Sequence, residues 1–178
     1  NNKVVYNTYH SFVRNGFTAM RFNFRGVGRS AGVYDNGVGE LSDAASAMDW
    51  LQLNNPDSNS FWVAGFSFGS WIAMQLLMRR PEIRGFVAIA PPVPKFDFNF
   101  LYPCPASGLI IQGNADSVVS VDHVTSLHDR LAKQKNVHVD YEIIDGGDHF
   151  FRTRMDKLVS TVEDYIRRRL EEAVEPLP

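Results

Sequence analysis

The chain has 178 residues, one cysteine, and 18 lysines and arginines against 20 aspartates and glutamates, for a formal net charge of −2. A hydrophobic fraction of 44% with so little net charge excludes an intrinsically disordered chain, and a single cysteine excludes a disulfide scaffold. No apolar run approaches the roughly 18–20 residues of a membrane span, and the balanced charge favours neither a nucleic-acid partner nor an anionic membrane.

In chain order, the first predicted elements are a strand, a loop and a helix. Residues 17–24 (FTAMRFNF) form a short aromatic run that is typical of a strand. Five glycines break the segment 25–39, so we predict a loop there. From 40 to 53, apolar residues recur every three or four positions, which indicates one face of an amphipathic helix.

The rest of the chain alternates strands with helices. We predict strands at 61–66, 86–90, 109–112 and 137–144, and helices at 69–80, 121–135 and 155–170. Arg79 and Arg80 are expected in the last turn of their helix, which Pro81 ends. The alternation predicts an α/β fold of three layers, with helices on both faces of a mostly parallel sheet. The length predicts one domain over 1–172 with a tail at 173–178.

A candidate nucleophile stands at the end of one predicted strand. Residues 65–69 (GFSFG) fit the pattern G-x-S-x-G between a strand and a helix. Such a turn exposes the serine hydroxyl, and Gly65 and Gly69 are expected to make room where neighbouring segments come close. The alternative is a tight turn with no chemical role. We predict that Ser67 is the nucleophile.

A serine nucleophile needs a base and an acid, and two later strand ends offer them. Asp116 follows the strand 109–112, and His149 follows the strand 137–144. Histidine takes up a proton near neutral pH, and a carboxylate orients its ring. Strand ends of a parallel sheet meet at one edge. We therefore predict a triad of Ser67, Asp116 and His149.

Other residues compete for these two roles. The rival histidines, which we expect to be structural or solvated, are His10, His123, His128 and His138. Asp122 is expected to be a first-turn acid of its helix, where the dipole favours a negative charge. Asp148 adjoins the proposed base, and adjacent side chains rarely share one hydrogen bond. Asp116 is therefore the preferred acid.

At four places the sequence resembles the α/β-hydrolases, and within them the small bacterial branch of dienelactone hydrolases and short-chain esterases. These places are 21–30 (RFNFRGVGRS), 65–69 (GFSFG), 113–116 (GNAD) and 147–151 (GDHFF). The resemblance implies a serine hydrolase that acts on a small-molecule ester or acyl substrate, with amides or peptides as the second choice. Dienelactone hydrolases use a cysteine, so their substrate is not carried over to Ser67. The resemblance also implies that the backbone N–H of Phe68 stabilises the oxyanion.

One part of the family pattern is missing. In the family, a strand and a loop precede the first helix, and that loop supplies the second oxyanion N–H. Residues 1–14 already resemble the helix after that loop, and the missing strand would lie between 17–24 and 61–66. Since residue 1 is asparagine and not methionine, we expect an N-terminally truncated piece of a longer natural chain. On its own, this piece is expected to show weak or no activity.

We predict neither a cofactor nor a metal. Gly26, Gly28 and Ala31 imitate the dinucleotide fingerprint G-x-G-x-x-A, but no helix begins within it, so a nicotinamide or flavin is not expected. No histidine, cysteine or carboxylate spacing suits a metal. Arg25 and Arg29 either fix this loop or attract anions.

Aromatic residues near the predicted site are candidates for substrate binding. Phe66, Phe150 and Phe151, with the loop 96–101 (FDFNFL), form the expected walls of an acyl pocket, and core packing is the alternative for each. A member of this fold that only binds a ligand or partner is the alternative to an enzyme. The use of a single cysteine fits a reducing compartment, and we expect a cytoplasmic location.

Overall fold

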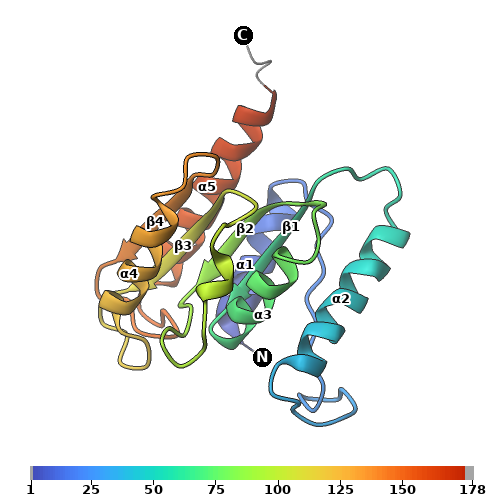
Figure 1. Ribbon diagram of the computed structural model, residues 1–178, viewed down its shortest axis with the longest axis horizontal. Coiled ribbons are helices and arrows are strands. Elements are labelled where there is room, and N and C mark those ends of the chain that lie inside the picture. The colour runs from blue at the N-terminus through green and yellow to red at the C-terminus, as the bar shows by residue number, and fades with distance from the viewer. Residues whose placement is uncertain (1, 175–178) are drawn as a thin grey trace.

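Four parallel strands form the sheet in the part of the chain that the computed structural model describes, residues 2–174. They lie in chain order across the sheet (Figure 1): β1 (Phe61–Phe66), β2 (Ile83–Ile89), β3 (Gly108–Gly113) and β4 (Val139–Ile144). Because all neighbours are parallel, the C-terminal ends of the strands meet at one edge. This is the edge at which ligands gather in open α/β sheets.

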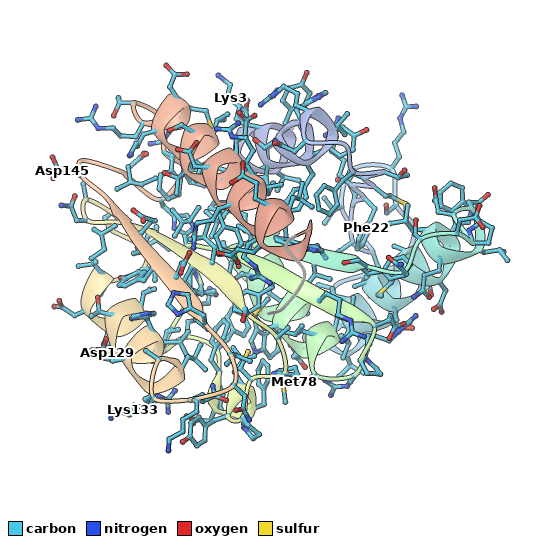
Figure 2. The ribbon with its side chains drawn as sticks, turned by 90° about the horizontal axis from the view of Figure 1, so that it is seen from above. Lys3, Phe22, Met78, Asp129, Lys133 and Asp145 are labelled. Carbon is cyan, nitrogen blue, oxygen red and sulfur yellow. The ribbon has the colours of Figure 1, made fainter. Side chains whose placement is uncertain are left out.

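Helices cover both faces of the sheet, as predicted. On one face lie α1 (Lys3–Arg14) and α5 (Met155–Val174), and the other face carries α2 (Val38–Leu53), α3 (Phe68–Leu77), α4 (Val121–Leu131) and the short 3₁₀ helix η1 (Asn99–Leu101). Figure 2 shows α1 and α5 above the sheet and α3 and α4 below it. The three-layer α/β fold is therefore confirmed.

The middle strands are apolar on both sides because both sides are covered. Phe86 and Ala88 of β2 pack into the core beneath α2, α3 and α4. Val87 and Ile89, the alternate residues of the same strand, pack beneath α1 and α5. Successive side chains of a strand point to opposite faces, so one continuous apolar run supplies both cores.

The predicted strand at 17–24 is wrong, because these residues carry no strand assignment. A strand exists only where its backbone pairs with a neighbour, and within residues 2–174 β1 pairs with β2 alone. Side chains hold the segment instead. Phe17 contacts the ring of Trp62 in β1, and Phe24 contacts the ring of Phe68 in α3. Phe17 and Phe24 therefore pack their side chains against the sheet and α3, and the backbone of this segment does not pair as a strand.

Two helices end earlier than predicted. α3 ends at Leu77 and α4 at Leu131, so Arg79 and Arg80 follow α3 and do not form its last turn. The residue before a proline disfavours helical backbone, which disfavours helix at Arg80. The Arg80 guanidinium instead forms an ion pair with Asp49 of α2 at 2.7 Å.

At the C-terminus, α5 continues through Val174 and includes the first residues of the predicted tail. Residues 175–178 of that tail lie outside the described residues. Among residues 2–174, none of the helices combines the length and the apolar character that crossing a bilayer requires.

Candidate active site

Ser67 occupies the sharp turn between β1 and α3. Its backbone has φ 50° and ψ −123°, which is an unfavourable conformation for a residue with a side chain. Two backbone bonds hold the turn: Ser67 N donates to Ile89 O at 2.8 Å, and Ser70 N donates to Ser67 O at 2.8 Å. The surrounding backbone therefore maintains the strain at Ser67.

Of the two glycines of the G-x-S-x-G pattern, only Gly65 is required by close approach. A Cβ atom on Gly65 would lie 2.3 Å from the carbonyl oxygen of Gly69. A Cβ on Gly69 would have no heavy atom within 4 Å. The prediction that both glycines are needed to make room is wrong for Gly69. The main chain of Gly69 crowds Gly65, but a side chain at position 69 would itself have space.

Phe68 is the first residue of α3. The first four N–H groups of a helix have no acceptor inside it, and the helix dipole places partial positive charge there. The Phe68 N–H, next to the hydroxyl of Ser67, is therefore available to an oxyanion. The family resemblance implies an oxyanion donor at this same position.

His149 lies in the loop after β4 and connects the other two predicted residues. Its Nδ1 is 2.8 Å from Oδ2 of Asp116, and its Nε2 is 3.1 Å from Oγ of Ser67. A carboxylate only accepts hydrogen bonds, so Nδ1 carries the proton of that pair and Nε2 is left to accept the serine hydroxyl. The side chain of His149 is 8% exposed. The structure thus brings Ser67, His149 and Asp116 together from three strand ends.

The Asp116 carboxylate is fully buried and fully hydrogen-bonded. Its Oδ1 accepts the backbone N–H groups of Val118 at 2.7 Å and Val119 at 2.8 Å. Its Oδ2 accepts the side-chain amide of Gln112 at 3.1 Å, in addition to its contact with His149. The sequence alone does not predict a role for Gln112 at the site. The signal for one is that Gln112 is a polar residue in the otherwise apolar strand 109–112.

The loops that carry Asp116 and His149 touch each other. A Cβ on Gly113 would lie 2.1 Å from the carbonyl oxygen of Gly147, which also accepts the N–H of Ala115 at 3.0 Å. The side-chain oxygen of Asn114 accepts the N–H of Gly146 at 2.8 Å. These contacts fix the separation of the acid and the base.

The rival carboxylates bind elsewhere. Asp148 accepts the N–H of Arg152 at 2.8 Å and pairs with its guanidinium at 3.2 Å. Asp122 is in the first turn of α4, as predicted. Neither carboxylate contacts the ring of His149.

The rival histidines also have other surroundings. His128 Nε2 lies 3.1 Å from the Val139 carbonyl oxygen, and His138 Nε2 lies 2.7 Å from Asp140. His10 packs against the ring of Tyr6. His123, by contrast, is exposed and lines the pocket beside Ser67.

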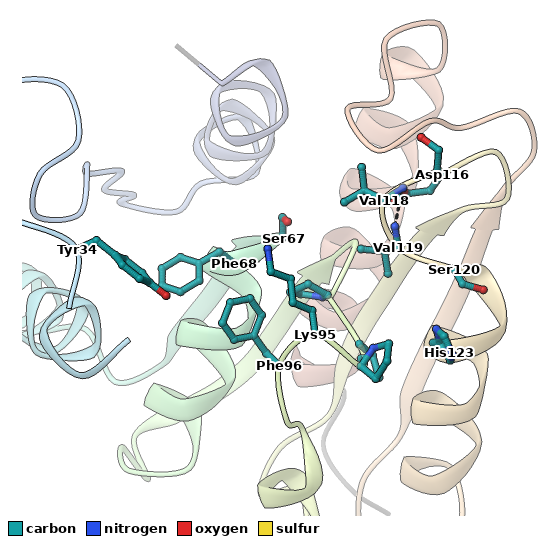
Figure 3. Close-up of a pocket in the computed structure, with 14 residues that line it drawn as sticks. Tyr34, Ser67, Phe68, Lys95, Phe96, Asp116, Val118, Val119, Ser120 and His123 are labelled. Carbon is teal, nitrogen blue, oxygen red and sulfur yellow. Dashed lines mark hydrogen bonds between the residues drawn. The ribbon is translucent and has the colours of Figure 1, made fainter. Parts of the chain in front are cut away.

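A pocket of about 540 Å³ opens beside Ser67 (Figure 3). Its aromatic side is formed by Tyr34, Phe68 and Phe96. Its opposite side is formed by the segment 116–120 and His123. The predicted aromatic loop 96–101 contributes Phe96, while Phe98 and Leu101 are buried in the core.

The three phenylalanines predicted for substrate binding lie apart from this pocket. Phe66 and Phe150 surround His149, with ring centroids 5.1 and 5.2 Å from the imidazole. Phe151 has no exposed surface and packs in the core beneath α1 and α5. The surroundings of Phe151 therefore match a core residue, which is the predicted alternative to substrate binding.

Arg25 fixes the loop at 25–37. Its guanidinium donates to Asp43 of α2 at 2.8 Å, and its backbone N–H donates to the same carboxylate at 2.9 Å. These hydrogen bonds lower the pKa of Asp43 from its ordinary value. Of the two roles open to Arg25, the contacts fit the structural one. Arg29 is exposed on the same loop.

Comparison with known proteins points to one superfamily. The family model of X-Pro dipeptidyl-peptidase (S15 family) matches residues 1–103, which include Ser67 but neither Asp116 nor His149. An uncharacterized protein of Rickettsia prowazekii is 56% identical over 170 residues, which cover 93% of this chain and 71% of the relative.

Two solved structures are similar over the whole of this chain. A protein of unknown function from Agrobacterium tumefaciens, described as a candidate α/β hydrolase, has 53% identity and a TM-score of 0.95, with 82% of its own length covered. A protein of Xanthomonas campestris, described as an α/β serine hydrolase without a lid, has 31% identity and a TM-score of 0.86, with 77% covered. The chain therefore belongs to the α/β-hydrolase superfamily, and within it to the X-Pro dipeptidyl-peptidase (S15) family whose model it matches.

Proposed function

We propose that the protein is a serine hydrolase that cleaves carboxylic esters of small molecules through an acyl-enzyme. The observation that carries the proposal is the line of contacts from Ser67 Oγ to His149 Nε2 at 3.1 Å, and from His149 Nδ1 to Asp116 Oδ2 at 2.8 Å. This order of donors and acceptors prepares the serine hydroxyl to lose its proton to a base.

The reaction then runs in two halves. Ser67 Oγ attacks the ester carbonyl while His149 takes the hydroxyl proton, and Asp116 stabilises the resulting imidazolium. The Phe68 N–H donates to the oxyanion, a type of contact that contributes about 10²–10³-fold to turnover. His149 returns the proton to the leaving alcohol as the carbon–oxygen bond breaks. A water molecule, deprotonated by His149, then releases the acid and regenerates Ser67.

Peptide cleavage is the second candidate, favoured by the match to the S15 family model. An enzyme that removes a dipeptide from a free N-terminus must bind an ammonium group, which calls for an accessible carboxylate. The carboxylate among the lining residues is Asp116, whose side chain is 0% exposed and already fully hydrogen-bonded. The lining also includes the cation of Lys95. The pocket of the described residues therefore suits an ester better than a peptide N-terminus.

The test is pre-steady-state hydrolysis of 4-nitrophenyl acetate by the full natural chain and by Ser67→Ala. An acyl-enzyme predicts a burst of nitrophenol close to one per active site, absent in Ser67→Ala. A protein of this fold that only binds a ligand gives no burst and no turnover. An Ala-Pro nitroanilide, run in parallel, distinguishes the peptidase: faster turnover of the anilide than of the ester would reverse the preference proposed here.

A further inference from the structure

The pocket beside Ser67 carries positive charge without an accessible negative partner. Lys95 lines it, and Figure 3 shows the side chain extending from the pocket wall toward Ser67. Within residues 2–174 Lys95 forms no ion pair, and its described contact is with the ring of Phe96, 5.8 Å from the amine. The side chain of Lys95 is exposed, and its ammonium group lies near the aromatic wall with no ion-pair partner among the described residues.

Further positive character comes from two helix ends. α3 begins at Phe68 and α4 begins after Ser120, and both residues line the pocket. The side chain of Ser120 makes no capping hydrogen bond, so it leaves the first N–H groups of α4 to other acceptors. His123, in the first turn of α4, adds two ring nitrogens to the same side. The free N–H groups at the two helix ends favour an anion.

Asp116 carries the one carboxylate among the described residues that line the pocket. Asp116 lines it, but its carboxylate is fully buried and bound by its own neighbours. Asp122 is exposed in the first turn of α4 and does not line the pocket. The lining also includes the apolar side chains of Val93, Phe96 and Val118.

We propose that the substrate of the esterase is an ester whose short apolar chain ends in a carboxylate, and that Lys95 binds this carboxylate. The proposal rests on the proposed ester hydrolysis at Ser67. The apolar side chains of the lining accommodate the chain, and the amine of Lys95 pairs with the anion while the ester carbonyl lies at Ser67. Lys95 is thus a residue that determines specificity and takes no part in the bond-breaking steps.

The experiment compares two esters of equal length that differ only in the terminal anion. Mono-4-nitrophenyl adipate and 4-nitrophenyl hexanoate are hydrolysed by the full natural chain, after subtraction of the spontaneous rate. The quantity measured is the ratio of kcat/KM for adipate to kcat/KM for hexanoate. Lys95→Met removes the charge at similar length, and Lys95→Arg keeps it. Lys133→Met, which removes an exposed lysine two residues after the end of α4, is the matched control.

We expect Lys95→Met to lower the ratio by up to about fivefold, the upper end of the range for an exposed ion pair. Lys95→Arg and Lys133→Met should keep the ratio of the unaltered chain. Raising the salt concentration to about 1 M should lower the ratio of the unaltered chain but not that of Lys95→Met, because salt screens exposed charges.

Two results overturn the proposal in distinguishable ways. Hydrolysis of both esters with the same ratio in Lys95→Met and Lys133→Met removes the role of Lys95 and leaves the esterase standing. A folded chain that hydrolyses neither ester and gives no acyl-enzyme removes the proposed function, and the anionic substrate with it.

Discussion

Gln112 donates a 3.1 Å hydrogen bond to Oδ2 of Asp116, the same oxygen that lies 2.8 Å from His149. Its amide nitrogen also donates to the carbonyl oxygens of Val119 at 2.9 Å and Gly113 at 3.2 Å. Three acceptors surround this nitrogen, so the amide has one orientation, even though its oxygen is buried without a partner. Gln112 therefore orients the acid that orients the base.

Replacing Gln112 with methionine should weaken catalysis while preserving the fold. A hydrogen bond to a charged group is worth about 1.5–3 kcal/mol, which corresponds to a loss in kcat/KM of about 10–100-fold. Methionine also removes the unpartnered oxygen, but it leaves the carbonyl oxygens of Val119 and Gly113 without this donor, so the melting temperature should fall while the chain stays folded. The matched control is Gln75→Met on α3, whose amide nitrogen is buried without a partner. Equal ester kinetics in the two variants would show that Gln112 has no positioning role.

The choice of Asp116 over Asp148 predicts opposite outcomes for two equivalent substitutions. Asp116→Asn presents an amide to His149 and disfavours the tautomer that accepts the serine proton, so kcat should fall by about 10⁴-fold. Asp148→Asn keeps an oxygen for the N–H of Arg152 and loses only an exposed ion pair. Its kcat should stay within about threefold of the unaltered chain. A reversed order of the two losses in steady-state ester kinetics would contradict the assignment of the acid.

The two glycines around Ser67 should respond differently to alanine. In Gly65→Ala the new Cβ meets main-chain atoms of Gly69 at 2.3 Å, which cannot move without displacing the start of α3. We expect a loss of unfolding free energy of about 2 kcal/mol or more. Gly69→Ala meets open space within a helix, where alanine is favoured over glycine by up to about 1 kcal/mol. Urea unfolding of both variants checks the pair, and equal destabilisation would contradict the contact.

The fold explains which features the sequence could predict. Continuous apolar runs mark strands that are covered on both faces, and the residues that follow such runs fall at one edge of a parallel sheet. This reasoning predicts Ser67, Asp116 and His149 at that edge, and the structure brings their side chains together. The glycine at 65 was also predicted for the right reason, close approach to the next turn.

The features that sequence reasoning missed depend on contacts between distant segments. Phe150 and Phe151 are neighbours, but φ of 52° at Phe151 turns the chain, so that Phe150 packs on His149 while Phe151 enters the core. The pocket is lined instead by Tyr34, Phe96 and the segment 116–120, which come from three separate loops. The periodicity of apolar residues within one helix or strand carries no information about which distant loops come into contact.

The pairing of Arg25 with Asp43 predicts a pH dependence of stability. Hydrogen bonds from Arg25 hold the pKa of Asp43 in the folded chain below its unfolded value of about 3.9. The pair therefore stabilises the fold fully above that unfolded value, and the stabilisation is lost as the pH falls through the folded pKa. In urea unfolding, the difference in free energy between the unaltered chain and Asp43→Asn should shrink from about pH 7 to about pH 3. A difference that stays constant over this range would exclude the linkage.

If Ser67 is the nucleophile of an acyl-transfer site, a reagent that reacts covalently with activated serines should modify it. The full natural chain and Ser67→Ala are treated with a fluorophosphonate, and the adduct is located by peptide mass spectrometry. We expect one phosphonate per chain, on Ser67, with no adduct in Ser67→Ala and greatly slowed labelling in His149→Ala. A folded chain that stays unlabelled, or a label on another residue that persists in Ser67→Ala, would contradict this role of Ser67.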